Sequence, residues 1–170
     1  MMVIRRSALL LFAATLVTGC FKSDKPLIGI FESTTPIAPG IYTYTQDGKT
    51  MSALISIDWP ATVRATVNED GSSKVDRFYM RKLYDNYYIV MDAQNNYGLI
   101  WVQNKSVSVA EADDCEKLQD IEDEFELEYN EVEVASEMMC KFKSFDRLAD
   151  AYKRLIEEKA LKVGVVYQRR

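Results

Sequence analysis

Polar and apolar residues alternate in a series of short stretches between residues 41 and 109. Alternation with a period of two is typical of β-strands that bury one face. Turn-forming pairs separate the stretches, among them Asp47-Gly48, Asp70-Gly71 and Asp85-Asn86. The strands predicted in this way are 41–45, 51–57, 62–67, 77–84, 87–91, 97–103 and a short one around 107–109.

The same pattern predicts which side chains face the core. In 62–67 it places Val63 and Ala65 on the inner face and Arg64 on the outer face. Residues 99–102 are apolar at every position, which predicts a central strand that is covered on both faces.

The clearest helix signal follows Ser144. Apolar residues recur there at helical spacing, namely Phe145, Leu148, Ala149, Tyr152, Leu155 and Ile156. This period predicts an amphipathic helix over 145–160 that packs on the sheet. A second helix is predicted near 113–126, where Asp113 and Glu116 have the spacing of a capping box.

Residues 130–142 and 163–167 read as extended again and complete the element pattern. The fold class we expect is α+β, with residues 41–170 forming one strand-rich domain. Its sheet is a curved antiparallel meander of six to eight strands, barrel-like or sandwich-like, with the C-terminal amphipathic helix packed on it.

The first 19 residues have a different pattern. Arg5 and Arg6 precede the ten-residue run 8–17, which is apolar except for Thr15, and small residues follow it. A basic start, an apolar stretch and small residues before a cleavage point are typical of a secretory signal peptide. A transmembrane helix would need about 20 apolar residues.

The signal ends in Val17-Thr18-Gly19-Cys20, which resembles the lipobox of bacterial lipoproteins. The resemblance implies cleavage between Gly19 and Cys20 and acyl chains, such as palmitate, on the processed Cys20. Two or three chains give lasting anchorage to a membrane. Phe21, not Asp, follows the cysteine, and in Gram-negative lipoproteins this implies the outer membrane, facing the periplasm. The domain behind it resembles small envelope lipoproteins without a characterised activity.

Residues 20–40 hold the lipidated cysteine and three prolines, Pro26, Pro36 and Pro39, with Ser and Thr between them. This composition predicts a tether that lets the domain stand off the bilayer. Ile28 and Phe31 are more apolar than a tether requires, so part of the segment is expected to dock on the domain.

Charge and composition exclude several classes of function. Removal of residues 1–19 leaves 19 basic and 26 acidic side chains, a net charge of −7 (19 − 26). An acidic domain is repelled by phosphates, so we expect no nucleic acid partner. The chain has no histidine, which excludes Ser-His-Asp and Cys-His catalysis and His-containing zinc sites.

The cysteines that remain after lipidation of Cys20 are Cys115 and Cys140. In an oxidising periplasm an even pair predicts a disulfide. A redox or nucleophilic role is the alternative, but the pair lacks a C-x-x-C spacing.

Three sets of residues are candidates for chemistry or binding. The segment 111–137 holds thirteen acidic residues and one lysine. It lacks the glycine and the ligand spacing of an EF-hand, so a solvated acidic face is favoured over a calcium site.

The second set is aromatic. The candidates for ligand-facing rings are Tyr42, Tyr44, Trp59, Tyr88 and Trp101. On one exposed face of the sheet they would stack on sugars or line an apolar pocket. Ordinary cross-strand packing is the favoured alternative.

The third set is charged. Asp58 and Asp92 are the acids nearest to apolar strands and would be the pair for glycoside cleavage, if burial held them on opposite sides of a bond. Arg77, Arg81 and Lys82 form a basic cluster for an anionic partner or lipid headgroup, unless they only keep a strand edge soluble.

No catalytic residue, metal ligand or cofactor is therefore assigned. We expect a non-enzymatic envelope lipoprotein, anchored through lipid on Cys20, that binds an envelope protein or a small envelope ligand. The alternatives are a structural factor in envelope assembly and, less favoured, a carboxylate-dependent hydrolase of envelope polymers.

Overall fold

The computed structural model describes residues 21–46, 49–69, 72–111, 128–131 and 138–170. The expected signal peptide, Cys20 and the helix expected near 113–126 lie outside these residues. The elements are β1 (Phe21–Lys22), β2 (Gly40–Gln46), β3 (Lys49–Asp58), β4 (Thr62–Glu69), β5 (Ser72–Tyr84), β6 (Tyr87–Met91), β7 (Asn96–Gln103), β8 (Ser106–Glu111), β9 (Glu128–Glu131), β10 (Met138–Lys141), α3 (Phe145–Glu157) and β11 (Lys162–Arg169).

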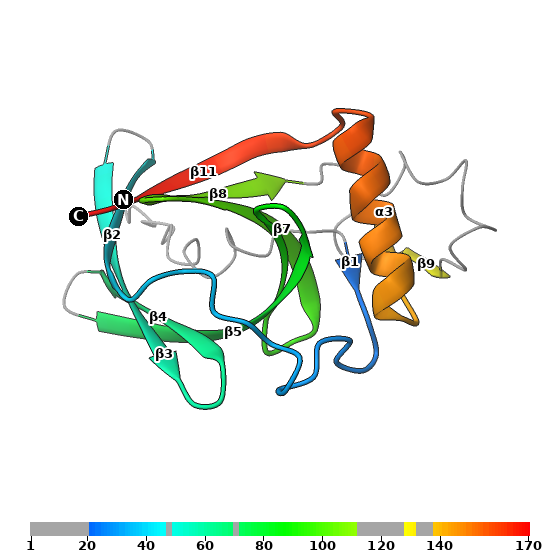
Figure 1. Cartoon of the computed structure of the whole chain (residues 1–170), viewed down its shortest axis with the longest axis horizontal. Helices are drawn as coiled ribbons and strands as arrows, with labels where there is room; N and C mark the ends of the chain where they lie inside the picture. Colours follow the sequence, from blue (N-terminus) through cyan, green and yellow to red (C-terminus); the bar gives the residue numbers. More distant parts are fainter. Residues whose placement is uncertain (1–20, 47–48, 70–71, 112–127, 132–137) are drawn as a thin grey trace, which may run out of the picture.

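Eight of the strands close into a barrel (Figure 1). β2 to β8 follow one another as antiparallel neighbours, and β11 closes the ring between β8 and β2. The expected antiparallel meander of six to eight strands is thus confirmed, in the form of a barrel. Beside β7, the short strand β1 pairs in parallel with β10, and β10 pairs with β9.

The barrel wall buries apolar side chains on both of its faces. Each of the eight barrel strands sends alternate residues into an inner cluster, for example Tyr42 from β2, Phe78 from β5 and Tyr167 from β11. In β7, Ile100 belongs to this inner cluster and Leu99 to a second cluster outside the wall. The prediction of a central strand covered on both faces is therefore confirmed.

The outer cluster contains buried residues of the barrel wall and of α3. It contains Ile89, Tyr97 and Leu99 from the wall together with Leu148 and Tyr152 from the helix. Ser144 caps the helix, because its side chain accepts a hydrogen bond from the backbone N–H of Arg147. Within the described part of the chain, no helix is both long enough and apolar enough to cross a membrane.

The segment expected to be a tether lies on the barrel. Phe21, Ser23 and Ile28 are buried, and the Ser23 hydroxyl lies 2.7 Å from the Tyr97 hydroxyl. The Tyr97 oxygen also accepts a hydrogen bond from the backbone N–H of Leu27 at 2.9 Å. Ile28 and Ile37 bury their side chains between the prolines, whereas Ile30 and Phe31 are 42% and 85% exposed. Part of the segment therefore docks on the barrel, as expected, although Phe31 does not take part.

Candidate functional site

The barrel interior is filled by its own side chains. A cavity of about 30 Å³ between described residues is lined by apolar and tyrosine side chains, including Tyr42, Ala53, Ala65, Phe78 and Tyr167. An engineered apolar cavity that binds benzene has about 150 Å³. This cavity is therefore too small for a sugar, a lipid chain or an aromatic ligand.

Two of the five candidate aromatics belong to this filled interior. Tyr42 donates a hydrogen bond from its hydroxyl to the carbonyl oxygen of Ala38 at 3.0 Å. Burial raises the pKa of Tyr42, and the nearby Arg169 partly offsets that rise. The Tyr44 hydroxyl donates to the sulfur of Met51 at 2.9 Å, and its ring packs on Tyr167.

The other three candidate aromatics do not share a face. Tyr88 packs against the inner cluster. Trp101 lies near Tyr87 of the outer cluster, with ring centroids 6.1 Å apart. Trp59 lies in the β3–β4 connection and is 87% exposed. These five residues therefore form no common stacking platform.

An open groove lies beside the first half of β5. β6 pairs with β5 from Tyr79 onward, because Met91 at the end of β6 pairs with Tyr79. Among the described residues, the earlier part of β5 pairs with β4 alone. The groove next to it has a volume of about 510 Å³ and is lined by residues 75–79, by the β6–β7 turn 91–95 and by Pro26.

Backbone hydrogen bonds show which residues of β5 present their main chain to this groove. The Met80 N–H donates to the Ser33 hydroxyl, and the Met80 carbonyl accepts from the Thr34 N–H. Ser33 also donates a hydrogen bond to the carbonyl oxygen of Ala61, the residue just before β4. The main-chain groups of Met80 therefore point toward the β4 side. Main-chain groups alternate along a strand, so those of Val75 and Arg77 point toward the groove.

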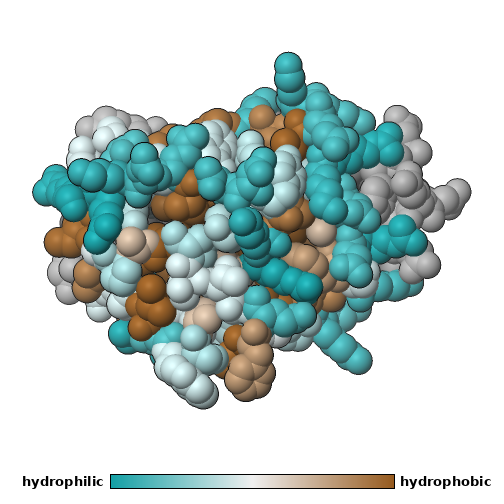
Figure 2. All heavy atoms as spheres, viewed as in Figure 1, coloured by the Kyte–Doolittle hydropathy of each residue, from teal (hydrophilic) through white to brown (hydrophobic). Residues whose placement is uncertain are grey.

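The outer face of this part of the barrel carries an apolar row. Strand register places Ile41, Leu54, Thr66 and Val75 side by side across β2, β3, β4 and β5. Ile41, Leu54 and Val75 are 50%, 51% and 49% exposed. Figure 2 shows that hydrophobic residues reach the surface in separate patches between polar ones, and not as one large apolar area.

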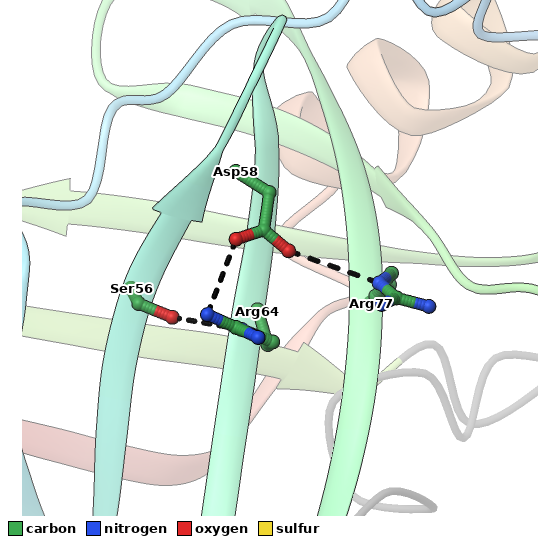
Figure 3. A network of polar contacts seen from close by, with 4 residues as sticks. All are labelled: Ser56, Asp58, Arg64 and Arg77. Carbon is green, nitrogen blue, oxygen red and sulfur yellow. Dashed lines mark hydrogen bonds and ion pairs between the residues drawn. The ribbon is translucent and has the colours of Figure 1, made fainter.

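A basic row runs next to the apolar row. Register pairs Ser56 with Arg64 and Arg64 with Arg77. Asp58 lies between the two guanidinium groups, 3.2 Å from Nη2 of Arg64 and 3.8 Å from Nε of Arg77 (Figure 3). Arg64 also donates from Nε to the Ser56 hydroxyl at 3.0 Å. One carboxylate thus faces two guanidinium groups, which leaves the cluster with one positive charge in excess.

Arg77 is the more accessible of the two arginines. Its side chain is 62% exposed, against 40% for Arg64. In Figure 3 the outer end of its guanidinium group points away from Asp58. Arg77 also lines the groove, so its terminal nitrogens are available to an acidic group that enters there.

The carboxylates considered for hydrolysis have structural roles. Asp58 is held by Arg64 and Arg77. Asp92 shapes the β6–β7 turn, because its Oδ1 accepts from the N–H groups of Gln94 and Asn96, and its Oδ2 accepts from the Asn96 side chain. Both carboxylates therefore already accept hydrogen bonds or ion pairs within the domain.

The basic cluster expected from the sequence is divided. Arg77 belongs to the Asp58 network, whereas Arg81 pairs with Glu32 at 3.1 Å and stacks over the ring of Phe145 at 3.9 Å. Lys82 is exposed and alternates to the other face of the strand from Arg81. The three side chains therefore do not form a single anion-binding site.

Of the three cysteines, Cys140 is the one among the described residues. Cys140 is fully buried and disulfide-bonded, while Cys20 and Cys115 lie outside the described residues, so the Cys115–Cys140 pairing stays a prediction. In the described residues no three acidic or cysteine side chains gather as metal ligands. Of the acidic segment 111–137, residues 112–127 and 132–137 lie outside the described part.

The sequence pattern did not indicate the groove or the Arg64–Asp58–Arg77 cluster. The alternation of 77–84 revealed that β5 is a strand, but not that its neighbour β6 ends early. Compared with known proteins, this chain matches no family model, no curated protein and no solved structure.

Proposed function

We propose that the chain is a lipid-anchored envelope lipoprotein without enzymatic activity, which binds a protein partner through the outer face of its barrel. The lipobox-like residues ending in Cys20 support the anchor, and Phe21 after it supports the outer membrane. In this proposal α3 stays packed on the β6–β8 side of the barrel and leaves the β2–β5 side to the partner.

The filled interior is the observation on which the choice of partner depends. A cavity of about 30 Å³ disfavours a carrier of small ligands, which would need an enclosed pocket. Half-exposed aliphatic side chains in one row, with Arg64 and Arg77 beside them, favour contact with another protein.

The competing functions are less well supported. A hydrolase would need a carboxylate held ready for substrate, and Asp58 and Asp92 are engaged with neighbours in the domain. A structural role in envelope assembly differs from the proposal mainly in requiring no dedicated partner, so the same experiment distinguishes the two.

The test is crosslinking in intact cells, followed by purification of the lipoprotein from the envelope. The proposal expects one stoichiometric protein partner for the wild type and a loss of that partner for Cys20→Ala, because the unanchored domain leaves the membrane. Leu54→Glu provides a second variant that keeps the anchor but places a charge in the apolar row. An envelope preparation without any crosslinked protein, in which a small molecule copurifies instead, would contradict the proposal.

A further inference from the structure

The first half of β5 is a strand edge with an empty place beside it in the described structure. From Ser72 to Phe78 the strand pairs with β4 on one side, and the groove of about 510 Å³ lies on the other. We propose that an extended segment of a partner protein binds here as an added strand, with an acidic side chain opposite Arg77. This inference rests on the proposed function in one respect, namely that the partner is a protein.

The main chain provides the binding groups. Val75 and Arg77 each present one N–H donor and one C=O acceptor to the groove, as the alternation from Met80 requires. A strand placed about 4.8 Å from β5 satisfies such groups directly. Strand addition of this kind supplies affinity through the backbone and specificity through alternate side chains.

The outer-face side chains of β5 determine which side chains the partner segment needs. Val75 is half-exposed at the end of the apolar row, so the residue opposite it gains contact if it is apolar. Arg77 comes two residues later on the same face and belongs to a cluster with excess positive charge. The matching segment therefore has an apolar residue and, two positions away, Asp or Glu.

The remaining charges at the groove are compatible with this pattern. Asp92 accepts three hydrogen bonds from its own turn. Asp76 alternates with Arg77 and lies toward the inner face of β5, since it pairs with the inward-facing Ala65. The charges on Asp76 and Arg77 disfavour addition of a wholly apolar strand, and Arg77 on the outer face selects an acidic one.

Synthetic peptides test the inference on the processed full-length lipoprotein in detergent. The first probe is a fluorescent, capped peptide of about seven residues in which valine, glutamate and valine alternate with threonine. The second replaces the glutamate by lysine, and the third is the first probe with alternate backbone nitrogens methylated. Fluorescence polarisation gives affinities, and hydrogen exchange of segment 72–78 locates the binding.

The wild type is expected to bind the glutamate peptide about three- to tenfold more tightly than the lysine peptide, because one cross-strand pair changes from attraction to repulsion. The methylated peptide is expected not to bind. Bound glutamate peptide should slow exchange of the Val75 and Arg77 amides. Arg77→Glu should reverse the preference, whereas Arg147→Glu, an exposed change on α3, should leave it unaltered.

Failure of the inference and failure of the proposed function give different results. Equal binding of the first and third peptides, or unchanged exchange in 72–78, would overturn strand addition. If Arg77→Glu still captures the crosslinked partner from the envelope at the wild-type level, the partner binds elsewhere, so the inference falls while the proposed function stands.

Discussion

Tyr42 shows how a single buried polar group is accommodated in this barrel. Its ring is almost fully buried, and its hydroxyl finds an acceptor at the carbonyl of Ala38, 3.0 Å away. Deprotonation would place a negative charge in a poorly hydrated site, so burial raises the pKa of Tyr42 despite the opposing effect of Arg169. The neutral phenol is therefore the form that the fold stabilises.

This shift has a consequence for stability at alkaline pH. A folded-state pKa above the unfolded value means that the folded protein holds the proton more tightly, so the stabilisation is complete below about pH 10 and is lost as the pH rises through the folded pKa. We therefore expect the wild type to lose unfolding free energy relative to Tyr42→Phe as the pH rises from about 8 to about 11. Urea titrations of both proteins measure it, and a constant difference would contradict the assignment.

At the scale of elements, strand length determines the candidate site. β5 has 13 residues and β6 has five, so β5 extends past its neighbour and leaves the edge at Val75 and Arg77. The alternating pattern predicted the 87–91 strand with the bounds that β6 has, and it predicted the inner positions Val63 and Ala65. A pattern along one strand contains no information about where the adjacent strand ends.

Strand register decides which residues distant in sequence become neighbours, and the sequence pattern does not reveal it. Arg64 and Arg77 are neighbours only because the β4–β5 hairpin pairs them directly. The burial of Phe21 and Ile28 likewise depends on partners such as Tyr97 that are distant in sequence. The helix signal was local, and α3 (Phe145–Glu157) lies within the predicted range 145–160.

The expected packing of α3 on the barrel gives a prediction at this scale. Leu148 is fully buried in the outer cluster, so Leu148→Ala is expected to lower the unfolding free energy by about 2–5 kcal/mol. Arg147→Ala, its exposed neighbour, should change it by less than about 0.5 kcal/mol. Denaturant titration of both variants checks this, and similar small losses for the two would mean that the helix is not packed on the wall.

For the whole molecule, two halves of the barrel surface have different neighbours. α3, β1 and β10 contribute to the outer cluster against β6, β7 and β8, whereas the row Ile41–Leu54–Thr66–Val75 stays half-exposed at its aliphatic positions. Among the described residues, this asymmetry leaves one face of the barrel without a covering element, and the proposed partner would bind there.

The anchor itself is tested by metabolic labelling with palmitate. The wild type is expected to incorporate the label and to fractionate with membranes, and Cys20→Ala is expected to do neither, because the acylated thiol is absent. Cys140→Ala serves as a matched control, since it removes a cysteine that the lipobox does not include and should keep the label. Labelled Cys20→Ala protein would refute the proposed attachment.

If Cys20 is lipidated as proposed, the burial of Phe21 would limit how far the domain can move from the membrane. With acyl chains on residue 20, the sheet begins at the next residue, so hardly any slack chain separates lipid from folded protein. A flexible stretch of about 16 residues would have an average reach of roughly 20–25 Å, whereas lipid on Cys20 would hold the domain close to the headgroups. Under this proposal its partners would be molecules of the same thin layer, where confinement raises the effective concentration.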